Sequence, residues 1–247
     1  SGLLDPLHGI LVAMEFSQWV THVELLQADT GVFVCLKIST TLSPEDQRLL
    51  TTFGGQHAIS MVCQQTDHND LWLCGSAENL SYSLQVASMD QPLELGFAMQ
   101  DFVQVNTKVN QGMVEQALNW LELKAKDQVL DLFSGVGNFA LPIASMADQG
   151  VAVLALEGDY AMVKKGRLNA QANGLSQVDF EQADLFDAGA RKLWQKKAFN
   201  KALLDPPRAG AKGLAGLLKN QPLERVVYVS CNLSLIHISE PTRLTMI

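Results

Sequence analysis

Five short apolar segments in the second half of the chain each end at a polar side chain that could bind a ligand or react. The segments are "QVLDLF", "VAVLALE", "VDFEQAD", "KALLDPP" and "RVVYVSC". Short apolar runs that alternate with helical or loop stretches are typical of the buried parallel strands of a doubly wound α/β sheet. Because the ligands of such sheets lie beyond the carboxyl ends of the strands, we expect the functional residues at the five segment ends.

The first two ends predict a site for an adenosine-containing ligand. Asp131 closes the first segment, and a turn with Gly135 and Gly137 leads to a helix expected near Asn138. Glycine lets the backbone approach a ligand closely, although any tight strand-to-helix turn also favours it. Glu157 ends the second segment about twenty residues later, where a carboxylate can accept hydrogen bonds from both ribose hydroxyls. NAD stays a minor alternative, because alanine can replace the third glycine of the dinucleotide motif.

The other three ends carry two carboxylates and a cysteine. Asp184 could accept a hydrogen bond from an adenine amino group, or it is a solvated loop residue. Asp205 is followed by two prolines, which fix the backbone and remove amide donors, and then by Arg208. Cys231 is the candidate nucleophile. A free thiol, with a pKa of about 8.5, is mostly protonated at neutral pH, so a nearby cation such as Arg208 would favour the reactive thiolate.

The remaining cysteines give no sign of a metal site or a disulfide framework. Cys35, Cys63 and Cys74 form no C-x-x-C pair and have no metal-like spacing with the histidines. Free cysteine commonly serves as a small buried hydrophobic residue. We therefore expect these three to be structural and assign no metal ligand.

The composition predicts a soluble, cytoplasmic protein. Hydrophobic residues make up 47% of the chain, without an apolar run of the roughly 20 residues that a membrane span needs and without a leader sequence. The formal net charge of -8 argues against a protein that coats nucleic acid non-specifically. Any contact with nucleic acid is expected to be local. We expect no interaction with a membrane.

The two halves of the chain differ in their pattern of apolar residues, and the second half carries the candidate site residues. Residues 1–95 read as a small α+β domain of short strands, with a hairpin around the Asp29-Thr30-Gly31 turn. After Asn106, Val109 and every fourth residue to Leu121 are apolar, which predicts an amphipathic helix. This helix introduces the parallel α/β sheet, and we place the second domain at residues 96–234.

Five motifs in one order give the sequence a specific resemblance. "DFVQVN", "VLDLFSGVGNF", "LALEG", "LLDPPRAGAKG" and "VYVSCN" resemble the RNA uracil-5 methyltransferases that use S-adenosylmethionine. The segment "HVELLQADTGVFVCLKISTTLSPEDQRLL" is most similar to the iron-sulfur-containing members that methylate 23S ribosomal RNA at uracil 1939. The resemblance covers residues 20–234 and implies a Rossmann-like methyltransferase sheet, truncated at its end, preceded by a small central domain.

The resemblance also implies roles for the residues at the strand ends. The positions that match residues around S-adenosylmethionine in the family are Gln104, Phe133, Asn138, Glu157, Asp184 and Asp205, next to the turn with Gly135 and Gly137. Cys231 matches the nucleophile that adds to C6 of a flipped uridine, after which C5 attacks the methyl group. From the chemistry alone, Arg208 could donate a hydrogen bond near O4 of the base.

The chain departs from the family pattern at both ends. The ligands of the iron-sulfur cluster and an OB-like RNA-binding region are expected in the full-length protein, outside this chain. After Asn232 the sequence "LSLIHISEPTRLTMI" lacks the last two family strands and the glutamate that acts as base, and Glu240 is no substitute. We therefore predict that residues 235–247 are a non-native tail and that the truncated chain, expected to be monomeric, lacks full turnover and is less stable than the whole enzyme.

Two other functions stay open. Asp-Pro-Pro-Arg is similar to the loops with which methyltransferases acting on exocyclic amines hold a flipped base, and that reaction needs no thiolate. The chain could also be a non-catalytic RNA-binding remnant that keeps the cofactor pocket only as structure.

Overall fold

The computed structural model folds into two compact units. It describes residues 2–14, 18–65, 70–75, 80–99, 101, 104, 106–146, 150–187, 197–211, 214, 218, 221–230 and 244–246. Unit 1 contains Ser1–Tyr82 and Ala98–Gln100, and unit 2 contains Ser83–Phe97 and Asp101–Ile247. Within the described residues, no helix is both long and apolar enough to cross a membrane.

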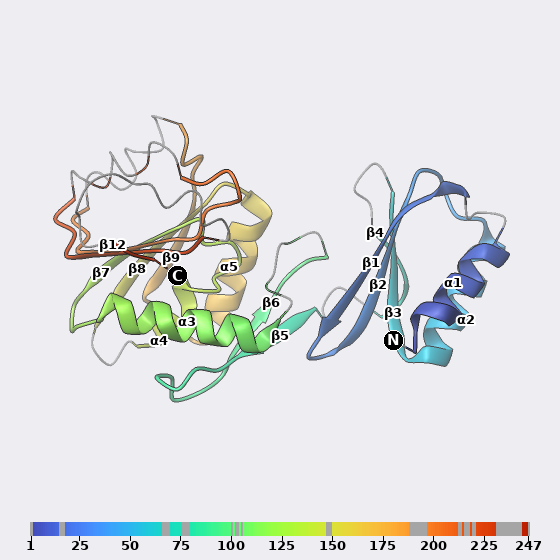
Figure 1. The fold of residues 1–247 in the computed structure, drawn as a ribbon, viewed down its shortest axis with the longest axis horizontal. Helices are drawn as coiled ribbons and strands as arrows, with labels where there is room; N and C mark the ends of the chain where they lie inside the picture. The colour runs from blue at the N-terminus through green and yellow to red at the C-terminus, as the bar shows by residue number, and fades with distance from the viewer. Residues whose placement is uncertain are drawn as a thin grey trace. The chain divides into compact units, whose positions relative to one another are not determined.

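Unit 1 is a four-stranded sheet with two helices on one face (Figure 1). Its elements are α1 (Leu4–Ala13), β1 (Val20–Ala28), β2 (Gly31–Ile38), α2 (Pro44–His57), β3 (Ile59–Gln65) and β4 (Asp70–Cys74), and the strand order is β1-β2-β3-β4. The predicted hairpin is confirmed, because β1 pairs with β2 in antiparallel register from Val20 to the turn before Gly31. Alternate β2 residues such as Val34 and Leu36 pack with Leu50 of α2 in one core.

Unit 2 is built on a six-stranded parallel sheet. The elements are β6 (Leu93–Gly96), which pairs with β5 (Ser81–Leu84), α3 (Thr107–Leu121), β7 (Gln128–Leu132), α4 (Ala140–Ser145), β8 (Ala152–Glu157), α5 (Tyr160–Ala172), β9 (Val178–Gln182), β10 (Lys201–Leu204), β11 (Arg225–Tyr228) and β12 (Leu244–Met246). The order β12-β11-β10-β7-β8-β9 is the Rossmann order, with the connections reversing direction between β7 and β10. The predicted fold class and all five predicted strands are confirmed.

The helices of unit 2 pack against this sheet. Figure 1 shows α3 and α4 together beside the sheet, and α5 packs on β8 and β9. The predicted amphipathic helix is confirmed as α3, and Ala117 and Leu121 of the predicted stripe are buried, but in its first half the buried face lies one residue later. Val109 is 59% exposed, whereas Asn110, Val114 and Leu121 are buried. The prediction for Val109 was wrong because the first buried residue of the helix, Asn110, is polar and so was not counted in the apolar spacing.

Two predicted boundaries differ from the observed structure. Residues 83–95 were expected in the first domain, but they belong to unit 2, where side chains of α5 hold β6 by hydrogen bonds. In the predicted tail, Leu244–Met246 form β12 in parallel with β11, although the sequence indicated no strand there. Pairing with β12 satisfies one edge of β11, which would otherwise present unpaired backbone groups. That residues 235–247 are non-native stays a prediction.

Candidate functional site

Three carboxyl groups lie at the carboxyl ends of three adjacent strands. Asp131 is the next-to-last residue of β7, Glu157 ends β8, and Asp205 directly follows β10. Because β7 pairs with β10 on one side and with β8 on the other, the three residues flank the point where the sheet connections reverse. This is where doubly wound sheets bind ligands. The structure therefore brings together three of the acidic residues that the sequence singled out.

Asp131 is the most unusual of these groups. Its side chain is fully buried, and neither carboxylate oxygen has a hydrogen-bond partner among the described residues. Burial, followed by the negative charges of Asp205 and Glu157, raises the pKa of Asp131 well above its usual range, and the nearby amide of Ala140 opposes this only weakly. A buried polar group without a partner is costly. A cationic or hydrogen-bond-donating ligand would supply the missing partner.

Asp205 stands at the start of a rigid loop. Its amide donates to the carbonyl of Leu132 at 3.3 Å, and after the two prolines Gly210 donates to the carbonyl of Pro207 at 2.7 Å. Burial raises the pKa of Asp205 to about 6. Arg208 lies in the same loop with its side chain exposed.

The raised pKa of Asp205 predicts a pH-dependent stability. In the native state Asp205 keeps its proton up to a pH of about 6, whereas in the unfolded state it loses the proton near 3.8. Between these values the unfolded state binds fewer protons, so we expect the free energy of unfolding to fall as the pH rises. The loss is at most about 3 kcal/mol for a shift of about two pKa units.

Urea unfolding of the wild type and of Asp205→Asn across this pH range measures this loss of stability. Asp179→Asn, at an exposed position on β9, is the control. Identical slopes in wild type and Asp205→Asn would contradict the prediction.

The glycine turn after β7 needs its glycines for two different reasons. Phe133, Gly135 and Gly137 have φ angles of 64°, 54° and 106°, in the left-handed region that favours glycine. A Cβ atom on Gly137 would lie 2.8 Å from Cγ of Leu141, so close packing excludes a side chain there. A Cβ atom on Gly135 would meet nothing within 4 Å. Gly137 therefore packs the turn onto α4, and Gly135, whose amide binds Glu157, has open space where a side chain would be.

Glu157 ties this turn to the end of β8. Its Oε2 atom accepts a hydrogen bond from the amide of Gly135 at 3.0 Å, and its Oε1 atom accepts one from the amide of Asp159 at 3.0 Å. Each carboxylate oxygen can accept a second hydrogen bond. Glu157 is thus held in place by the backbone and keeps acceptor capacity for the hydroxyl groups of a ligand.

Asn138 follows the turn and pairs with a residue that the sequence did not single out. Asn110 and Asn138 each donate from Nδ2 to the Oδ1 of the other, and both bonds are 2.8 Å long. Asn110 is only 2% exposed. The signal that could have found Asn110 is a polar residue in the buried stripe of an otherwise amphipathic helix. The cofactor role of Asn138 stays a prediction, and its amide is oriented by α3.

The end of β9 adds an aromatic residue to the candidates. Oδ1 of Asp184 accepts a hydrogen bond from the amide of Phe186 at 2.9 Å, so the exposed Asp184 closes its own turn. The ring of Phe186 lies 5.9 Å from that of Phe133, centroid to centroid, and Phe186 is 55% exposed. An exposed aromatic residue beside polar groups is a frequent component of ligand sites. Gln104 is half-buried, and its cofactor role stays a prediction.

The candidate nucleophile, Cys231, lies outside the described residues. Of the other cysteines, Cys63 is buried and Cys74 is half-buried. Burial raises the pKa of Cys63 to about 12 and also raises that of Cys74, so neither thiol is activated. No group of three or more His, Cys, Asp or Glu side chains in the described part of the chain is placed to hold a metal ion.

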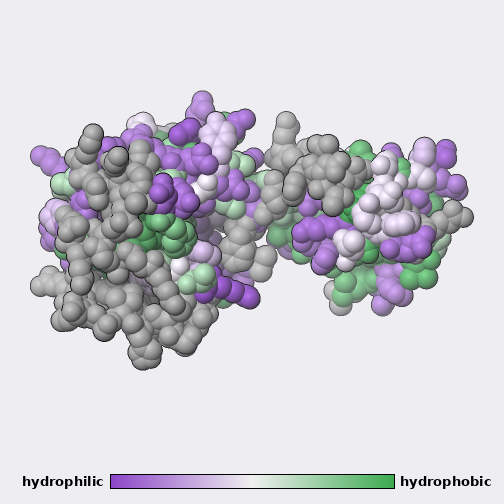
Figure 2. Space-filling model, turned by 90° about the horizontal axis from the view of Figure 1, so that it is seen from above, coloured by the Kyte–Doolittle hydropathy of each residue, from purple (hydrophilic) through white to green (hydrophobic). Residues whose placement is uncertain are grey.

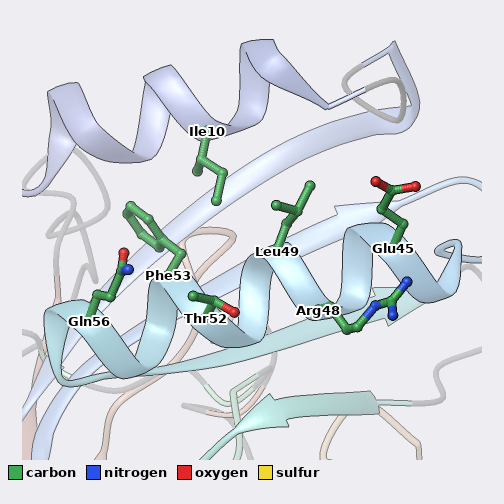
Figure 3. A pocket seen from close by; sticks show the side chains of 7 residues that line it. All are labelled: Ile10, Glu45, Arg48, Leu49, Thr52, Phe53 and Gln56. Atoms are coloured by element: carbon green, nitrogen blue, oxygen red, sulfur yellow. The ribbon is translucent and has the colours of Figure 1, made fainter.

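A groove in unit 1 contains none of these residues. It has a volume of about 410 Å³ between α1 and α2 and is lined by Ile10, Glu45, Arg48, Leu49, Thr52, Phe53 and Gln56 (Figure 3). Ile10 points from α1 toward α2, and charged side chains lie at one end. Figure 2 shows hydrophobic and hydrophilic surface intermixed over this unit. The groove offers no nucleophile and no cluster of titratable groups for chemistry.

Comparison with known proteins identifies the family. Residues 55–239 match the family described as tRNA (Uracil-5-)-methyltransferase. The chain belongs to this family. The matched range includes the glycine turn, the three carboxylates and Cys231, so the resemblance carried by the sequence motifs is confirmed.

Curated proteins similar to this chain include methyltransferases named for 23S ribosomal RNA. The chain is 40% identical over 233 residues to a 23S rRNA (uracil(1939)-C(5))-methyltransferase RlmD of Shewanella piezotolerans. It is 41% identical over 238 residues to the RlmD of Erwinia tasmaniensis. In both cases the alignment covers 94% of this chain and 50% of the relative, so the chain spans about half the length of these proteins.

Among solved structures, the chain is similar to an RNA methyltransferase from Salinibacter ruber in complex with S-adenosyl-L-homocysteine. The TM-score is 0.38 with 27% sequence identity, over 48% of this chain and 71% of the other.

Proposed function

We propose that this chain is part of an enzyme that transfers a methyl group from S-adenosylmethionine to C5 of a uridine in 23S ribosomal RNA. The observation that carries the proposal is the family match over residues 55–239, which contains the glycine turn, the carboxylates and Cys231 in one order. The RlmD relatives, named for uracil 1939, support 23S RNA as the substrate. A cytoplasmic monomer acting on a flipped uridine belongs to the same proposal.

The described residues fit the proposed cofactor. S-adenosylmethionine, when bound, supplies an electrophilic methyl group on a positively charged sulfur. Glu157 keeps acceptor capacity for ribose hydroxyls, and Gly135, whose amide binds it, has open space where a side chain would be. Asp131, buried and without a partner among the described residues, suits a cationic ligand. Phe133 and Phe186 offer apolar ring surface for a purine.

The uracil-5 reaction assigns the covalent step to Cys231. C5 of uracil is a poor nucleophile, but addition of the Cys231 thiolate to C6 places an enolate electron pair at C5 and O4. C5 then takes the methyl group, the C5 proton leaves to a base, and the sulfur–C6 bond breaks to regenerate the thiolate. Arg208 is proposed to stabilise the charge at O4.

The proposal is tested with RNA in which the target uridine is replaced by 5-fluorouridine. Fluorine cannot leave C5 as a proton, so after methyl transfer the Cys231–C6 bond cannot break and a covalent protein–RNA complex accumulates. We expect intact-mass analysis to show this complex only when S-adenosylmethionine is present. If the chain binds S-adenosylhomocysteine by calorimetry but forms no complex, the uracil-5 proposal is wrong. Methyl transfer to an amino group of ordinary RNA would then identify an amine methyltransferase, and no transfer would identify a binding remnant.

A further inference from the structure

Asn169 of α5 and Asn173, which caps the C-terminus of that helix, bind the backbone of β6 as a neighbouring strand would. Asn169 donates from Nδ2 to the carbonyl of Gly96 at 2.9 Å, and the Gly96 amide donates back to Oδ1 at 2.9 Å. Asn173 makes the same pair with Glu94, at 2.8 and 3.0 Å. Four residues of a helix rise about 6 Å and two residues of a strand about 6.6 Å, so the two spacings match. β6 is therefore held on α5 by side-chain amides.

Asn169 differs from Asn173 in its third hydrogen bond. Asn169 also donates from Nδ2 to the carbonyl of Val136 at 3.0 Å, and Val136 lies between the two glycines of the turn after β7. The third bond of Asn173 goes back to the last turn of α5, to the carbonyl of Asn169 at 2.8 Å. Asn169 is 4% exposed, and both its Nδ2 hydrogens and its Oδ1 atom are engaged. It thus joins α5, β6 and the glycine turn at one buried point.

The glycine turn is then held from both sides. Asn169 binds the carbonyl of Val136, and Asn110 binds the side chain of Asn138 just beyond the turn. The glycine residues of the turn can adopt many backbone conformations, and the observed left-handed φ angles are only one of them. The turn therefore depends on these contacts to stay in its observed conformation. The Gly135 amide, which binds Glu157, lies only two peptide groups before the Val136 carbonyl, so a rotation of the backbone at Val136 can displace it. A loss of the hydrogen bond to Val136 is therefore expected to change the position of Glu157 as well.

We infer that Asn169 is a positioning residue for the cofactor site, which it serves by fixing the glycine turn against β6. The identity of the cofactor in this inference rests on the proposed function. The contacts of Asn169 with the turn and with β6 do not depend on it. Preorganised sites bind more tightly because less freedom is lost on binding. Asn173, which shares the clamp on β6 without touching the turn, supplies the matched control.

The test compares Asn169→Ala with Asn173→Ala in the whole chain. Each variant loses one of the two amide pairs on β6, and both are expected to melt at a lower temperature. Only Asn169→Ala is expected to weaken binding of S-adenosylhomocysteine, by about tenfold for a lost buried hydrogen bond and the freed turn. Amide hydrogen exchange of residues 135–137 is expected to accelerate in Asn169→Ala alone. Equal effects of the two variants on affinity and exchange would overturn the inference and leave Asn169 as a structural residue.

A measurement on the wild type covers the case in which Asn169→Ala does not fold. The Gly96 amide donates to Oδ1 of Asn169, so its exchange rate reports on the clamp. Saturating S-adenosylhomocysteine is expected to slow exchange at Gly96, and an unchanged rate would contradict the coupling. If the wild type binds no S-adenosylhomocysteine, the proposed function fails. In that case faster exchange of residues 135–137 in a folded Asn169→Ala would still support the positioning of the turn, and unchanged exchange would overturn it.

Discussion

Replacement of Cys231 by alanine is expected to abolish the covalent complex with 5-fluorouridine RNA completely and to leave the affinity for S-adenosylhomocysteine unchanged. Only a thiolate adds readily to C6 of the pyrimidine, and without this addition C5 has no electron pair with which to take the methyl group. The loss is all-or-none because the alanine side chain offers no nucleophile. Intact-mass analysis and calorimetry on the same preparation measure the two quantities.

The other cysteines make a stringent control for this result. Cys74 is the most accessible of the three that the structure describes, and burial still raises its pKa above the ordinary value. Cys74→Ala is therefore expected to form the complex at the wild-type rate. A complex that persists in Cys231→Ala would show that another group attacks the base. Methylation of ordinary RNA that survives in Cys231→Ala would instead favour chemistry on an amino group, which needs no thiolate.

The parts of the fold that were predictable from the sequence are those set by local pattern. The strands β7, β8, β9, β10 and β11 were found because parallel strands are buried on both faces and read as short apolar runs. Their carboxyl ends then had to share one edge of the sheet, which brought Asp131, Glu157 and Asp205 together. A three-residue strand such as β12 has too few residues to show any pattern.

The contacts that orient the candidate site could not be predicted in this way. Asn110 and Asn138 are 28 residues apart, and Asn169 and Gly96 are 73 residues apart. Asparagine is common in turns and caps for local reasons, so its type alone does not indicate a long-range partner. Only the tertiary structure shows that these amides hold the glycine turn. The residues expected from the sequence would supply the ligand contacts, and the residues that the sequence missed hold them in place.

Replacement of Glu157 by alanine is expected to weaken binding of S-adenosylhomocysteine by about 100-fold, because charge-assisted hydrogen bonds to a ligand contribute about 1.5–3 kcal/mol each. The substitution also removes the acceptor of the Gly135 and Asp159 amides, which frees the turn. Glu157→Gln keeps one oxygen but turns an amino group toward one of these amides, so a smaller loss of about tenfold is expected. Glu181→Ala, on the neighbouring strand β9, should bind as the wild type does.

The role of Glu157 in ribose binding can be separated from its role in the turn by the choice of ligand. If its carboxylate accepts hydrogen bonds from the ribose, removal of the 2′-hydroxyl from S-adenosylhomocysteine weakens binding to the wild type. The same removal should then change binding to Glu157→Ala very little, because the partner of the hydroxyl is already gone. Calorimetric titrations of both ligands with both proteins complete this cycle and give the coupling between the two groups. Equal losses for the 2′-deoxy ligand in wild type and variant would show that Glu157 acts only through Gly135 and Asp159 and that the ribose is bound elsewhere.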